Sequence, residues 1–214
     1  MDRKAQATAI LNSVNSSGQH YRDSLPMIAS ENILSPLVAK AVNSDLHGRY
    51  AEGLPGKRYY QGCEDFDSIE SLGIESAKRV FNCNFTNIQS TSGTVSNIAT
   101  LKALVKPGET ITAVSTADGG HISHARMGAV GVRGLNLVTY PWDIDRMEPD
   151  IDASIKMIRE TKPNLALFAL CSLATSQEKV WHQLQRGIRA ASHTRCGCEV
   201  VERYVLALAF FILF

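Results

Sequence analysis

The sequence predicts an α/β domain with a largely parallel sheet. Segments with strand character alternate with segments of helical period along the middle of the chain, and the last of these strands, residues 164–170, is a continuous apolar run. The chain has 214 residues, of which 44% are hydrophobic and 20% charged. This composition is that of a globular protein long enough to bury one sizeable core.

The first third of the chain is expected to be partly helical. Residues 1–22 are polar with a weak helical pattern, which predicts an arm or a short first helix, and residues 23–62 are rich in turn formers. In residues 64–81 the apolar side chains recur at helical spacing. Acidic residues come early there and Lys78-Arg79 come late, an order that suits the helix dipole, so these residues are predicted to form a helix.

The alternation of elements begins after this helix. A short segment, 85–89, leads through Ser90-Thr-Ser-Gly-Thr94 into a helical pattern, and Pro107-Gly108 marks a turn. The elements predicted beyond that turn are strands at 110–115 and 134–140, a helix at 150–161 with acids at its start, and the apolar strand at 164–170.

Charge, cysteines and the two ends of the chain argue against several classes of protein. The net charge is +1, without a basic stripe, which disfavours nucleic-acid binding. The five cysteines match no disulfide framework, and Cys196 and Cys198 lack a second ligand pair, so we expect reduced thiols, no metal site and a cytoplasmic protein. No signal peptide is expected. The apolar run 205–214 is shorter than the roughly 20 residues of a membrane span; it reads as a buried strand, a helix start or an insoluble tail.

The stretch RYAEGLPGKRYYQG, residues 49–62, is the first candidate site. It is no P-loop, because Ala51 stands where the first glycine should be and Arg58 follows the Gly-Lys pair. Leu54-Pro55-Gly56 is a type II turn signal. The turn is flanked by a dense set of hydrogen-bonding side chains: Tyr50, Glu52, Lys57, Arg58, Tyr59 and Tyr60. A plain turn and a functional loop both remain open.

Two further candidates lie where a strand gives way to the next element. Ser92-Gly93-Thr94 opens a helix, so its free backbone N–H groups suit a phosphate, although a plain N-cap explains the same residues. Asp118-Gly119-Gly120-His121 follows a strand, and its glycines let the imidazole lie against a flat or anionic ligand. The alternative is an ordinary surface or core histidine. Residues 27–32, MIASEN, suit a cap or a ligand-contacting loop.

In combination, four motifs resemble the serine hydroxymethyltransferase family. They are IASEN (28–32), RYAEGLPGKRYYQGCE (49–64), TSGTVSN (91–97) and DGGHISH (118–124), and their wording is similar to the archaeal branch. The resemblance covers about residues 20–172. It implies a pyridoxal-phosphate-dependent fold of type I, the large domain of the aspartate aminotransferase-like superfamily, with helices on both faces of a mostly parallel sheet that is incomplete here.

The resemblance also implies roles for single residues. Ser92, Gly93 and Thr94 would bind the cofactor phosphate, His121 would stack on the pyridine ring, and Ser172 matches a serine near the cofactor. The remaining implied roles are Tyr50 on the phosphate of the neighbouring subunit, Glu52 in proton transfer, Tyr60 near the substrate carboxylate, Ser30 on the substrate amino acid, and Thr116 and Ile122 near the pterin.

The implied activity is reversible transfer of a hydroxymethyl group between serine and a reduced pterin, giving glycine, in one-carbon and amino-acid metabolism, by a homodimer. Pyridoxal phosphate would act as the electron sink. A Glu52 carboxyl enclosed by tyrosines would be desolvated, which favours its protonated form. Two alternatives stay open: another fold type I enzyme for β-hydroxy amino acids (an α-methylserine hydroxymethyltransferase or a threonine aldolase), and a non-catalytic remnant that binds a full-length subunit.

The resemblance predicts three parts: an N-terminal arm (1–48), a partial major domain (49–172) and a divergent tail (173–214). The tail matches no motif of the family, and we consider a shifted reading frame as its origin. The family's covalently bound lysine stands in a Thr/His-Lys context that no lysine here has, Lys179 included. We therefore expect these 214 residues alone to be inactive and aggregation-prone. A cofactor absorbance removed by borohydride, together with serine cleavage, would refute this.

Overall fold

The computed structural model describes residues 2–27, 31 and 33–168, in two units that divide after Glu31. The first unit contains one helix, α1 (Arg3–Arg22), which has no buried residue. At 20 residues it is longer than the predicted arm or short helix. Its first turns hold Arg, Lys, Gln and Ala, which are strong helix formers, and no proline interrupts it.

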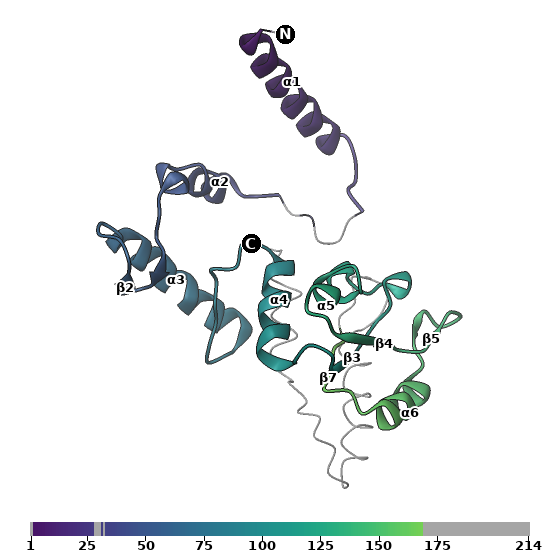
Figure 1. Ribbon diagram of the computed structural model, residues 1–214. Helices are drawn as coiled ribbons and strands as arrows, with labels where there is room; N and C mark the ends of the chain where they lie inside the picture. The colour runs from purple at the N-terminus through teal and green to yellow at the C-terminus, as the bar shows by residue number, and fades with distance from the viewer. Residues whose placement is uncertain (1, 28–30, 32, 169–214) are drawn as a thin grey trace. The chain divides into compact units, whose positions relative to one another are not determined.

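The second unit begins with short elements in the stretch predicted to be rich in turns (Figure 1). They are helix α2 (Pro36–Val42), the 3-10 helix η1 (Asp45–Gly48) and the antiparallel hairpin of β1 (Gly53–Leu54) and β2 (Lys57–Arg58). Gly56 has φ +71°, which the position after proline in a type II turn requires, so the predicted turn at 54–56 is confirmed.

Helix α3 (Glu64–Phe81) has the bounds that the sequence predicts. Three acids lie in its first turn and Lys78 and Arg79 in its last, and Asn82 ends it in the left-handed conformation. None of its residues is buried, and Leu72 is 70% exposed.

A parallel sheet forms the centre of the second unit, as predicted. Its order is β4 (Asn136–Thr139), β3 (Thr110–Ala113) and β7 (Leu165–Ala166), with both pairings parallel. The strands are shorter than their apolar runs, because pairing ends where the flanking residues turn into loops. The predicted strand at 164–170 extends beyond the described residues.

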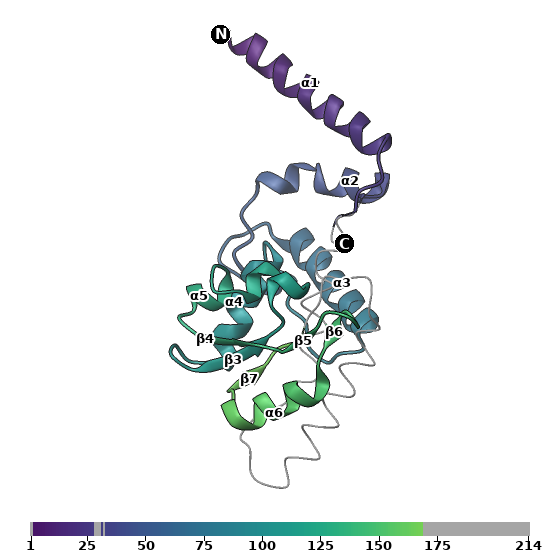
Figure 2. The same cartoon turned by 90° about the vertical axis from the view of Figure 1, so that its right-hand side faces the viewer.

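Helices cover both faces of this sheet (Figure 2). Helices α4 (Gly93–Leu104) and α5 (Ala129–Val132) cover one face, where Leu101 and Val130 pack with Ile111. Helix α6 (Ile151–Thr161) covers the other, where Ile158 packs with Val114. Ile111 and Ala113 of β3 thus belong to the core of one face, and Val114, directly after the strand, belongs to the core of the other.

The connections carry elements that the sequence did not reveal. Two 3-10 helices, η2 (Thr116–Asp118) and η3 (Ile122–His124), follow β3 directly. A hairpin of β5 (Trp142–Asp143) and β6 (Glu148–Pro149) follows β4. None of the helices in the described part is long and apolar enough to cross a membrane.

Candidate active site

The N-terminal end of α4 offers backbone donors. Ser92 caps the helix: its Oγ accepts from Val95 N at 3.2 Å and its carbonyl accepts from Ser96 N at 3.0 Å. Within the described residues, the N–H groups of Gly93 and Thr94 have no acceptor. The plain N-cap is therefore confirmed, and it still leaves two donors at the positive end of a 12-residue helix.

The glycine pair after β3 turns the chain back onto the end of the strand. Gly119 has φ +91° and ends η2, and the N–H of Gly120 donates to Ser115 O at 2.8 Å. A Cβ on Gly120 would overlap the carbonyl oxygen of Val114. A side chain is thus excluded at position 120, directly before His121.

A buried polar network joins His121 to α4. The Nδ1 of His121 lies 2.7 Å from Ser123 Oγ, which in turn lies 2.5 Å from Asn97 Nδ2 on α4. Ser123 is 1% exposed and Asn97 6%. Helix α4 therefore both carries residues 92–94 at its N-terminal end and holds the His121 imidazole through Asn97.

Asn97 and Ser123 were absent from the site that the sequence predicts. Asn97 lies one helical turn after Gly93 and one before the buried Leu101, so it is a polar residue on the apolar face of the helix. A polar residue on the apolar face of a helix was the one sequence feature that could have pointed to Asn97.

His124 is buried beside these residues, 6% exposed. Burial, and secondly the charge of His121, lower the pKa of His124 from 6.5 to about 4. The folded protein therefore holds His124 neutral at pH values where an unfolded chain would protonate it.

This difference predicts a loss of stability in mild acid. Because the unfolded chain binds the extra proton, the free energy of unfolding should fall by up to about 3 kcal/mol between pH 6.5 and 4. His124→Asn should flatten the dependence in urea unfolding, whereas His47→Asn, at an exposed site, should not. An unchanged slope in His124→Asn would contradict the assignment. Asp67, whose pKa is lowered from 3.8, loses its contribution only below that pH.

The loop 49–62, here called the tyrosine loop, is held by Arg58. The guanidinium, 5% exposed, donates to the carbonyls of Ala51 and Gly53 at 2.7 Å each, which are the residues on either side of Glu52. It also pairs with Asp67 at 2.7 Å and Glu70 at 2.6 Å on α3. The Gly56 N–H, and then Arg58, lower the pKa of Asp67. The backbone that carries Glu52 is thus tied to α3.

Several side chains of the tyrosine loop lie in solvent, unlike Arg58. Tyr50 and Tyr60 are 78% and 49% exposed, with ring centroids 5.8 Å apart, and Glu52 is exposed. The expectation that tyrosines enclose the Glu52 carboxyl is therefore wrong for this chain. The physical reason is that Arg58 anchors the loop by its backbone and leaves these side chains outside.

The predicted site residues fall into two groups among the residues described. One holds Ser92, Gly93, Thr94 and His121, and the other holds Tyr50, Glu52 and Tyr60. No hydrogen bond, ion pair or ring contact within the described ranges joins the groups. Thr116 and Ile122 are exposed at the starts of η2 and η3. The predictions for Ser30, Ser172 and Cys196/Cys198 lie outside the described residues.

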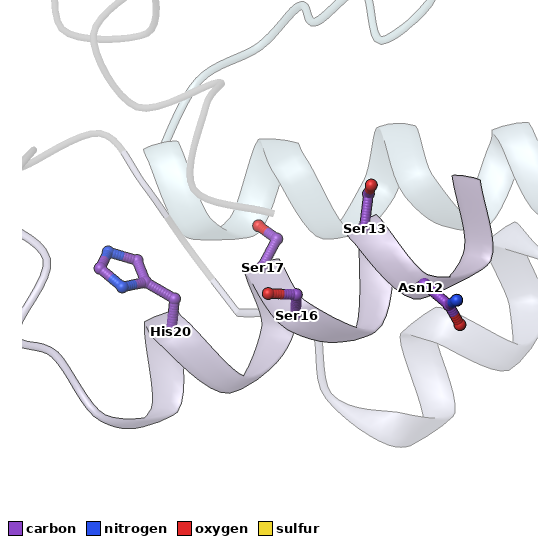
Figure 3. A pocket seen from close by; sticks show the side chains of 5 residues that line it. All are labelled: Asn12, Ser13, Ser16, Ser17 and His20. Atoms are coloured by element: carbon purple, nitrogen blue, oxygen red, sulfur yellow. The ribbon is translucent and has the colours of Figure 1, made fainter. Parts of the chain in front are cut away.

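A hollow on α1 is lined by polar side chains of that helix (Figure 3). Its lining residues are Asn12, Ser13, Ser16, Ser17 and His20. They follow one another along a single face of one exposed helix, so this hollow carries no candidate site.

Fold and site together define a class: an α/β protein that presents backbone donors and an imidazole beside a parallel sheet. The profile of the family "Serine hydroxymethyltransferase" matches residues 4–185, most of the chain. The chain therefore belongs to the serine hydroxymethyltransferase family, which depends on pyridoxal phosphate. The matched range extends past residue 172, where the divergent tail is predicted to begin.

Archaeal proteins are among the relatives, as the motifs indicated. The "Serine hydroxymethyltransferase" of Methanocella arvoryzae is 48% identical over 159 residues, covering 74% of this chain and 38% of the relative. That of Methanocaldococcus jannaschii is 50% identical over 147 residues, covering 69% and 34%. That of Picrophilus torridus is 49% identical over 150 residues, covering 70% and 35%. The chain thus spans between a third and two fifths of these relatives.

Proposed function

We propose that this chain supplies the phosphate-binding and ring-binding part of a pyridoxal-phosphate-dependent enzyme. The proposed reaction is reversible transfer of a hydroxymethyl group between serine and a reduced pterin, giving glycine. One observation carries the proposal: the free N–H groups of Gly93 and Thr94 and the imidazole of His121 are supported by the same helix, α4. The proposed reaction is taken from the serine hydroxymethyltransferase family, to which the chain belongs.

The described residues fit the cofactor by their chemistry. A phosphate needs donors and positive potential, which the start of α4 offers through two unpaired N–H groups and the helix dipole. A pyridine ring needs a flat partner, which His121 offers after a pair of glycines that keep side chains away. When bound, pyridoxal phosphate supplies an electron sink for the substrate carbanion.

The roles of the other residues are proposed from the motif positions. Ser92 orders the helix end by capping it, and Glu52 transfers a proton during hydroxymethyl exchange. Tyr60 and Ser30 bind the substrate, Ser172 lies near the cofactor, and the pterin binds beside Thr116 and Ile122. Arg58 holds the backbone on both sides of Glu52, which limits its movement.

We propose a homodimer in which the tyrosine loop serves the site of the neighbouring subunit. Three observations support this: Tyr50 is 78% exposed, Glu52 is exposed, and no described contact joins this loop to His121. A partner surface would also provide the enclosure of Glu52 that this chain alone lacks. Tyr50 would then bind the phosphate held by the partner's helix.

The activity is tested in a chimera, because the chain spans 38% of the Methanocella arvoryzae relative. Residues 4–168 of this chain replace the matching segment of that relative. The chimera is expected to convert serine to glycine at a rate within about tenfold of the relative, since nearly half of the matched residues are identical. The assay measures glycine with pyridoxal phosphate present, with and without reduced pterin.

The same assay separates the alternative activities. Dependence on pterin supports the hydroxymethyltransferase, whereas threonine cleavage without pterin and no reaction with serine would favour an aldolase. A chimera that folds, dimerises and binds pyridoxal phosphate but acts on neither substrate would contradict the proposed function. The unmodified relative is the control for assay conditions.

A further inference from the structure

In the polar network that joins His121 to α4, the donor and the acceptor of each hydrogen bond can be assigned. Two groups of Ser123 face the same ring nitrogen of His121: the backbone N lies 3.1 Å from Nδ1 and the hydroxyl Oγ 2.7 Å. A backbone N–H is always a donor, so Nδ1 must be an acceptor and carries no hydrogen. The hydroxyl of Ser123 must therefore also donate to Nδ1. The proton of a neutral His121 is then on Nε2.

The hydroxyl of Ser123 needs a donor of its own. Asn97 Nδ2 lies 2.5 Å from Ser123 Oγ and 3.3 Å from His124 Nε2. An amide nitrogen has two hydrogens, so one donates to Ser123 and the other to His124. His124 Nε2 is consequently an acceptor, and its proton is on Nδ1.

In this orientation Asn97 Oδ1 and His124 Nδ1 have no partner among the described residues, but reversing the Asn97 amide brings two donors into contact. With the amide oxygen facing Ser123, the hydroxyl would donate to that oxygen and could only accept from His121. Nδ1 of His121 would then carry a hydrogen pointing at the backbone N–H of Ser123, which is a contact between two donors. The backbone N–H of Ser123 in η3 thus determines the orientation of the Asn97 amide on α4.

We infer that Asn97 and Ser123 are positioning residues that hold His121 as the Nε2–H tautomer and its neighbour His124 as the Nδ1–H tautomer. Both residues lie within the motifs TSGTVSN and DGGHISH, but the resemblance implies no role for either of them. The inference deepens the proposed function: a His121 ring fixed in plane and tautomer would present a defined face to the cofactor. No hydrogen bond from the described part of the chain reaches Nε2 of His121, so its N–H is available to a ligand.

The test is the protonation of the ring nitrogens, measured without cofactor. Magic-angle-spinning NMR of the full chain with ¹⁵N-labelled histidine, at about pH 8 where free histidine is neutral, distinguishes bare from protonated nitrogens and tolerates self-association. We expect a bare Nδ1 for His121 and a bare Nε2 for His124, with assignment by His121→Asn and His124→Asn. The opposite pair of tautomers, or rapid averaging at His121, would overturn the inference.

Variants test which residues impose the tautomer. Ser123→Ala removes the hydroxyl donor but keeps the backbone N–H donor, so Nδ1 of His121 should stay bare and its resonance should shift as one of its two hydrogen bonds is lost. Asn97→Asp keeps the side-chain shape but has no N–H donor, so the serine hydroxyl should turn to the carboxylate and shift Nδ1 in the same direction. An unchanged His121 signal in either folded variant would overturn that residue's role. The wild-type spectrum decides the tautomer even if a variant fails to fold.

Ser154→Ala is the matched control. Ser154 is as buried as Ser123, lies on α6, and its Oγ has no partner within the described residues. This change deletes a buried hydroxyl without contact to either imidazole and should leave both spectra unchanged. Because no cofactor or substrate enters the measurement, a wrong tautomer and a wrong proposed function give separate results.

Discussion

Glu52→Gln in the chimera is expected to lower pterin-dependent conversion of serine to glycine by about 10²-fold or more. Glutamine keeps the size of the side chain but cannot transfer a proton. The change should stay local, because Arg58 binds the carbonyls on both sides of position 52. The measurement is the rate of glycine formation at saturating serine and pterin, together with the affinity for pyridoxal phosphate, which should not change.

Glu75→Gln is the control for this substitution. Glu75 lies on α3, is 66% exposed and pairs with Lys78, so the same chemical change there should leave the rate within about twofold, as expected for a surface pair. Full activity of the Glu52→Gln chimera would contradict the proposed role of Glu52 in proton transfer. A variant that also fails to dimerise would instead give the side chain a role in the subunit interface.

Ser92→Asp is expected to weaken pyridoxal phosphate binding strongly while leaving α4 intact. Aspartate caps a helix as well as serine does, and the helix dipole favours its charge, so the free energy of unfolding should not fall. The carboxylate would stand beside the phosphate site, and a like-charge contact costs several kcal/mol. The affinity of the chimera for pyridoxal phosphate should therefore fall by about 10²-fold or more, as measured by absorbance titration.

Ser35→Asp makes the same change at another serine cap. Ser35 Oγ accepts from Val38 N at the start of α2, so the variant controls for the effect of an aspartate cap on folding. Its affinity for pyridoxal phosphate should equal that of the parent chimera. Unchanged cofactor affinity in Ser92→Asp would show that the phosphate binds elsewhere.

Elements with strong local signals could be predicted from the sequence. The α3 bounds, Glu64–Phe81, follow from apolar spacing and from charges ordered along the dipole, both properties of the segment itself. The Pro55-Gly56 turn and the alternation that produces a parallel sheet are local in the same way. Short elements such as η2 and η3 were missed because three residues carry no period.

The parts of the site that the sequence did not reveal are contacts between distant residues. Asn97 and Ser123 are 26 positions apart, and no pattern in either segment indicates the other. The motifs placed Glu52 and Tyr60 close together in sequence, which suggested an enclosed carboxyl. Enclosure depends on tertiary and subunit contacts, and the single chain leaves Glu52 in solvent. The motifs therefore single out Glu52 as a candidate residue but do not reveal its surroundings.

The most direct measurement is a crystal structure of the chimera grown with pyridoxal phosphate. The phosphate is predicted to accept from the backbone N–H groups of Gly93 and Thr94, with the pyridine ring against the imidazole of His121. A phosphate bound away from the start of α4, or a ring without contact to His121, would contradict the proposed site even in an active enzyme.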